Sequence, residues 1–213
     1  MEPVKPRLRG VIHQWSFFVS LVAGAVLVLA AQSMSARLAA GIYALALSGL
    51  LGVSALYHRV TWSQGARRWM RRLDHTMIFV LIAGTYTPFA LVVLPGTLPK
   101  VVLGVVWAAA AAGVVLNLLW TDSPRWVMAV FGIALGWVLI AVMPELAATA
   151  GPWATGLLLA GGMLYTAGAV VYAVGRPDPV PAVFGYHEIF HVFVVVAAAT
   201  HYAGVAVSVL PTG

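Results

Sequence analysis

The residues with the clearest capacity for chemistry share one short stretch: His187, Glu188 and His191. They match the H-E-x-x-H pattern, in which two histidines on a helix bind zinc and the glutamate serves as a general base. Histidines four residues apart project from one helical face, about 6 Å apart along the axis, so both imidazoles can contact one ion. The sequence therefore predicts a metal-binding helix, and metal-dependent hydrolysis is the chemistry that such a helix supports.

A third protein ligand is required, because zinc takes four tetrahedral ligands and a catalytic site keeps one position for water. The chain contains no cysteine, and no aspartate or glutamate follows Glu188. His201 shares a face with His187, but it lies about 15 Å along the axis from His191 and cannot reach the same ion. His58 is the obvious candidate for the third ligand, so the predicted metal ligands are His58, His187 and His191.

Two further polar residues are predicted to be catalytic. Asp74 is a weak candidate for a metal ligand and a better candidate for a partner of metal-bound water. A carboxylate there can orient that water and accept its proton. Ser54 precedes His58 by one helical turn on the same face. Its hydroxyl could donate a hydrogen bond either to a ligand or to a developing oxyanion.

The elements that position these residues are predicted to be membrane-spanning helices. The chain of 213 residues is 62% hydrophobic and 8% charged, whereas soluble domains carry about 25% charged residues. Its apolar stretches are long enough to cross about 30 Å of hydrocarbon. Seven such spans are predicted, at residues 15–31, 37–58, 73–94, 101–120, 125–143, 153–174 and 186–209.

The predicted fold class is therefore all-α, a seven-helix transmembrane bundle. A short basic cytoplasmic segment covers residues 1–14, and a single transmembrane domain covers residues 15–213. The first span follows a basic leader, as a signal peptide would. Its length and its aromatic start, where a membrane interface would lie, favour a retained helix.

The basic residues predict how the bundle is oriented. Of the 12 lysines and arginines, only Arg37 and Lys100 belong to the side opposite the N-terminus. The positive-inside rule then places the N-terminus in the cytoplasm and the C-terminus outside. Topology accounts for the net charge of +6, and no nucleic-acid partner is expected.

This topology predicts that His58, Asp74, His187 and His191 share one depth in the inner leaflet, with Asp74 in the first turn of the third helix. His13 and His75 lie on the same side, where histidines of membrane proteins are typically interfacial, and we do not include them as ligands. Pro88 predicts a break in the third helix, because it lacks a backbone donor.

Three segments carry a resemblance to a known family: SALYHR (54–59), RRLDHTMIFVLIAGTYTPF (71–89) and HEIFHVF (187–193). They resemble the signature regions of the hemolysin III family, the bacterial branch related to the progestin and adipoQ (adiponectin) receptors. The resemblance implies a multi-pass protein of the bacterial inner (plasma) membrane with zinc near the cytoplasmic side. By the same resemblance His58, His187 and His191 are the zinc ligands, Asp74 holds the zinc water, and Ser54 accompanies them.

The resemblance also suggests activities. The wider superfamily includes relatives similar to alkaline ceramidases, which implies hydrolysis of a lipid amide, with a membrane lipid at the inner leaflet as the substrate. A receptor or signalling module with structural zinc is one alternative, and a pore-forming protein, as the family name implies, is another. A membrane metalloprotease with Glu188 as general base would need a downstream carboxylate ligand, which the chain lacks.

Overall fold

The computed structural model describes residues 6–120 and 122–210, and every long element within these ranges is a helix. Seven spans are long and apolar enough to cross a membrane, which confirms the predicted all-α, seven-span fold. The α-helices are α1 (Val11–Ala30), α2 (Met34–Arg59), α3 (Gln64–Pro88), α4 (Leu98–Leu119), α5 (Arg125–Gly136), α6 (Met143–Thr149), α7 (Gly151–Val174) and α8 (Tyr186–Val209). A π-helix, η1 (Phe89–Val93), extends α3, and a 3₁₀-helix, η2 (Trp137–Val142), joins α5 to α6.

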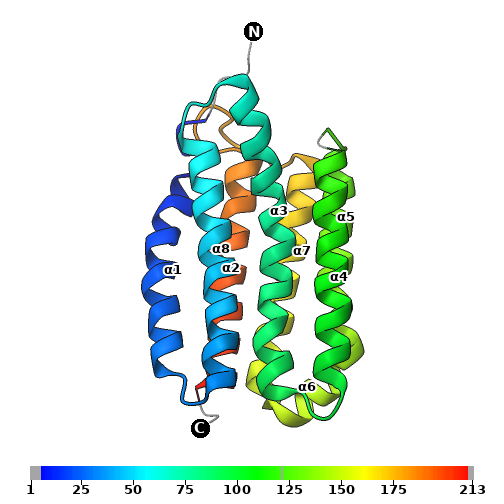
Figure 1. Ribbon diagram of the computed structural model, residues 1–213. Coiled ribbons are helices and arrows are strands. Elements are labelled where there is room, and N and C mark those ends of the chain that lie inside the picture. The colour runs from blue at the N-terminus through cyan, green and yellow to red at the C-terminus, as the bar shows by residue number, and fades with distance from the viewer. Residues whose placement is uncertain (1–5, 121, 211–213) are drawn as a thin grey trace.

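The spans lie side by side in a bundle (Figure 1), and the contacts between neighbouring spans form a closed ring. Each span packs on the next one in the chain, and α8 returns to α1. Helix α8 also contacts α2 and α3, so the last span meets two early spans inside the bundle. Helix α1 begins and α8 ends at opposite ends of the bundle (Figure 1). The end where α1, α3 and α8 begin and α2 ends is called the N-terminal end below.

Small residues allow the inner helices to approach closely, as is typical of helix pairs in membranes. A Cβ atom added to Gly84 of α3 would lie 2.5 Å from the Cβ of Ala46 in α2. The outer surface instead carries large apolar side chains, including Leu29 and Trp153, which are 79% and 81% exposed. The apolar residues are therefore divided between a tightly packed interior and a surface suited to lipid.

Helix α3 begins nine residues earlier than predicted, at Gln64 rather than residue 73. The hydroxyl of Ser63 accepts a hydrogen bond from the backbone nitrogen of Ala66 and caps the helix. The turns before residue 73 are basic, so a prediction based on runs of apolar residues did not include them. The prediction that Asp74 lies in the first turn is wrong, because Asp74 follows ten residues of helix.

The third span departs from α-helical geometry at the predicted break, and the fifth span continues past its predicted end. After Pro88, the backbone continues as the π-helix to Val93. The fifth span was predicted to end at residue 143, but it runs through η2 and α6 to Thr149, with Pro144 in the first turn of α6. Proline is tolerated there because amide groups in the first turn of a helix have no intrahelical partner.

Candidate metal centre

Three histidines meet at the N-terminal end of the bundle. His58 lies in the last turn of α2, and His187 and His191 lie in the first two turns of α8. One ring nitrogen from each lies within 4.8 Å of the others. The packing of α2 on α8 brings these residues together across 129 positions of sequence.

The arrangement of these nitrogens suits a shared metal ion. The Nε2 atoms of His58 and His187 are 3.2 Å apart. Two Zn–N bonds at a tetrahedral angle separate their nitrogens by about 3.3 Å. The same distance also suits a hydrogen bond between two neutral imidazoles. His58 and His191 are 6% and 2% exposed, and His187 is partly buried, so these three nitrogen ligands could hold a metal ion.

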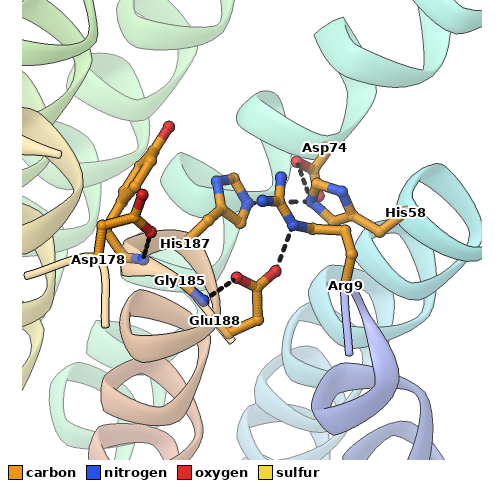
Figure 2. A network of polar contacts seen from close by, with 8 residues as sticks. Arg9, His58, Asp74, Asp178, Gly185, His187 and Glu188 are labelled. Atoms are coloured by element: carbon orange, nitrogen blue, oxygen red, sulfur yellow. Dashed lines mark hydrogen bonds and ion pairs between the residues drawn. The ribbon is translucent and has the colours of Figure 1, made fainter. Parts of the chain in front are cut away.

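The two predicted catalytic residues lie beside the triad. The Oδ2 atom of Asp74 is 3.9 Å from Nε2 of His58 (Figure 2). Ser54 is buried one turn before His58, and it lines the same small pocket as Asp74, His187 and His191. The packing of the helices therefore brings all five predicted site residues to one place.

A residue not predicted for the site, His13, lies directly against it. Its ring stacks on that of His191, with 3.8 Å between the ring centroids and 12° between the planes. His13 is 2% exposed, so the interpretation as an interfacial histidine is wrong. His13 is buried because α1 packs against α8 in the bundle and covers His191. A lone histidine in an apolar stretch gives no signal for this.

Glu188 is bonded to groups other than the histidines. Its Oε2 atom accepts a hydrogen bond from the backbone nitrogen of Gly185 at 2.8 Å, and its Oε1 atom pairs with Arg9 (Figure 2). Both carboxylate oxygens of Glu188 therefore have partners at the start of α8. This geometry argues against Glu188 as a general base and fits a carboxylate that caps the helix.

The segment that carries Arg9 is hydrogen-bonded to the loop before α8, next to the site. The backbone nitrogens of Arg7 and Leu8 donate to the carbonyl oxygens of Ala182 and Val183, at 3.1 and 3.2 Å. The guanidinium of Arg9 also lies close enough to His187 to interact electrostatically (Figure 2). Residues 6–10 and the loop before α8 therefore form a cover at the N-terminal end.

An apolar cavity of about 150 Å³ extends from the site into the bundle, between α3, α5, α7 and α8. It shares Leu50, Ile78, Tyr172, Phe190 and other residues with the pocket beside the triad. The walls further from the site are mostly aliphatic and aromatic. The apolar cavity therefore adjoins the pocket beside the triad.

Tyr172 and Asn117 lie at the same end of the bundle but differ in role. Tyr172 lines both the pocket and the cavity. Asn117 instead donates from Nδ2 to the carbonyl oxygen of Arg72 and to Oγ1 of Thr76, at 2.7 and 3.1 Å. Asn117 thereby joins α4 to α3 and is not among the pocket residues.

Comparisons with known proteins agree with the fold. A family model described as "Haemolysin-III related" matches residues 1–202. "Hemolysin-3" of Bacillus cereus is 30% identical over 205 residues, covering 95% of this chain and 90% of that protein. "Hemolysin-3 homolog" of Bacillus subtilis is 33% identical over 146 residues, covering 68% and 65%. "Monocyte to macrophage differentiation factor" of Homo sapiens is 27% identical over 196 residues, covering 89% and 78%.

Proposed function

Since this chain belongs to the hemolysin III family of membrane proteins, we propose that it is a zinc-dependent hydrolase that cleaves an amide in a membrane lipid. The observation that carries the proposal is the triad itself: three histidines, two buried and one partly buried, with ring nitrogens within 4.8 Å of one another, next to an apolar cavity. We place the protein in the bacterial plasma membrane, with the triad at its cytoplasmic side.

In this proposal His58, His187 and His191 hold the zinc ion. Zinc bound there supplies Lewis acidity, which activates water and polarises a carbonyl group. Asp74 accepts a proton from the attacking water and passes it to the leaving amine. Ser54 donates a hydrogen bond to the oxyanion of the substrate. The products are a carboxylic acid and an amine.

The apolar cavity supports a lipid as the substrate. A chain that occupies it would contact mainly aliphatic and aromatic side chains, such as Phe79, Ile82 and Leu158. Its head group would then lie at the polar pocket, beside Asp74 and Ser54. An amide at the junction between chain and head group would therefore be presented to the triad, as hydrolysis requires.

Metal content tests the ligand assignment. We expect elemental analysis of the detergent-purified protein, prepared without chelator or added zinc, to find about one zinc per chain, as a single ion with three protein ligands requires. His58→Ala, His187→Ala and His191→Ala should each lose it. His75→Ala is the matched control, because His75 lines the same pocket but lies outside the triad. A wild-type protein without zinc would refute the proposal.

The role of Asp74 is tested by Asp74→Asn. This change should leave zinc bound, because the three histidines remain, and it should lower turnover of a lipid amide by about 10²- to 10⁴-fold, the usual contribution of a general base. Zinc content and turnover are measured on the same preparation. Full activity in the variant would show that another group moves the proton.

A second candidate is a receptor or signalling module in which the metal is structural. It is favoured by the placement of the triad, which joins the end of α2 to the start of α8. Zinc would then stabilise the bundle by binding only the folded state. A zinc-loaded protein that turns over none of a panel of lipid amides, and that loses thermal stability when zinc is removed, would favour this role.

A further inference from the structure

His201 is one of the residues that line the apolar cavity. Its Nε2 atom lies 3.0 Å from the carbonyl oxygen of Leu158 in α7. A carbonyl oxygen only accepts hydrogen bonds, so Nε2 carries the hydrogen, and Nδ1 of the neutral imidazole is left as an acceptor. This Nδ1 atom is buried and has no hydrogen-bond partner among the residues that the structure describes.

The position of the His201 ring is closely defined. The ring packs on Gly161 of α7, where an added Cβ atom would overlap it. The ring of Tyr165 lies on another side, with 5.3 Å between centroids. With the bond to Leu158, these contacts hold His201 in one orientation. The Nδ1 acceptor is therefore held in one position, on a residue of the cavity wall.

Three hydroxyl groups of the cavity wall have hydrogen-bond partners within the chain. The hydroxyl of Thr85 donates to the carbonyl oxygen of Leu81 at 2.8 Å. The hydroxyl of Thr166 donates to Gly162 at 2.8 Å, and that of Tyr86 donates to Gly136 at 2.6 Å. A buried acceptor without a partner lowers stability. A ligand that supplies a donor to His201 would satisfy it.

We propose that the cavity selects lipid chains that carry a hydroxyl group remote from the amide, and that this hydroxyl donates a hydrogen bond to Nδ1 of His201. This inference rests on the proposed function for the position of the amide. His191 and His201 are ten residues apart on α8, or about 15 Å along its axis. A hydroxyl beside the amide would stay near the triad, so the selected hydroxyl lies well along the chain.

Binding of fatty acids tests the proposal without any hydrolysis. The probes are stearic acid, hydroxystearic acids with the hydroxyl at different positions, and the matching ketostearic acids. Each competes with a fluorescent fatty acid for the purified protein in lipid nanodiscs. We expect a mid-chain hydroxyl to bind about fivefold more tightly than stearic acid, which corresponds to one ordinary hydrogen bond. A keto group, which cannot donate, should give no gain.

Two variants locate the effect. His201→Phe should remove the preference for the hydroxyl, because the acceptor is lost while the ring volume is largely kept. Thr85→Val is the matched control and should retain the preference, because the Thr85 hydroxyl is already bonded within its helix. The comparison of hydroxyl with keto probes needs only the wild-type protein, so the test remains valid if His201→Phe does not fold.

Four results would overturn the proposal. Equal binding of all probes would mean that only water bonds to His201. Equal gains from hydroxyl and keto groups would contradict the assignment of Nδ1 as an acceptor. A preference that survives His201→Phe would place the hydroxyl elsewhere, and failure of every fatty acid to bind would show that the cavity takes no chain. A His201-dependent preference without any amide hydrolysis, in contrast, would refute the proposed function alone.

Discussion

Glu188 stands between two residues of the histidine triad, yet it binds a different part of the chain. It is 1% exposed and bonded to Gly185 and Arg9. A buried carboxylate requires such partners, because removal from water is costly for a charge. The start of α8, and with it the position of His187 and His191, therefore depends on Arg9 in the segment before α1.

Arg9→Met should destabilise the protein by about 2 kcal/mol. Removal of one partner leaves the carboxylate of Glu188 buried without a cation, and the value is reduced because Arg9 is 21% exposed and partly screened. Thermal unfolding of the detergent-purified protein, followed by tryptophan fluorescence, measures the change. Glu188→Gln in the Arg9→Met background should recover stability, because a neutral amide oxygen still accepts from Gly185. Equal stability of Arg9→Met and wild type would refute this role.

The residue types at the site could be predicted from the sequence, whereas their full surroundings could not. His58, His187 and His191 are recognisable because few side chains can bind a metal in a chain without cysteine. His13 and Arg9 carry no comparable pattern. They reach the site only because α1 closes the ring on α8 and residues 6–10 bond to the loop before α8, and neither contact is encoded in local spacing.

At the scale of the elements, the distance between α2 and α3 determines how Asp74 faces His58. Gly84 permits the close approach of these helices, because its missing side chain makes room for Ala46. The apolar spans could be predicted, since length and hydropathy define them. The first turns of α3 could not, because they are basic and depend on the Ser63 cap rather than on burial.

Gly84→Ala should destabilise the bundle by about 2 kcal/mol, since an added methyl group in a tightly packed interior forces the helices apart. Gly104→Ala in α4 is the matched control, because nothing lies within 4 Å of its added Cβ atom. The control should change stability by less than about 1 kcal/mol. Thermal unfolding of both variants provides the comparison. Helix propensity favours alanine over glycine in both variants, so a similar change in both would show that the contact with Ala46 does not limit this substitution.

At the scale of the whole molecule, the ring of seven spans separates two ends of unequal charge. The last turn of α2, the first turns of α3 and the start of α5 carry arginines at the N-terminal end. The opposite end has Arg37 and Lys100, near the starts of α2 and α4. The triad and its cover of residues 6–10 lie at the more basic end, so the orientation of the bundle decides which leaflet supplies a lipid to the site.

We predict that the basic end faces the cytoplasm, because positively charged connectors are retained on that side. Fusions at the C-terminus should then give active alkaline phosphatase and non-fluorescent green fluorescent protein, since the former requires export and the latter folds in the cytoplasm. Fusions at Ser123, between α4 and α5, should give the reverse and serve as the control. Fluorescence at the C-terminus with inactive phosphatase would place the triad at the outer leaflet. The expected result would place it at the inner leaflet, where a lipid amide would reach the triad from the cytoplasmic side.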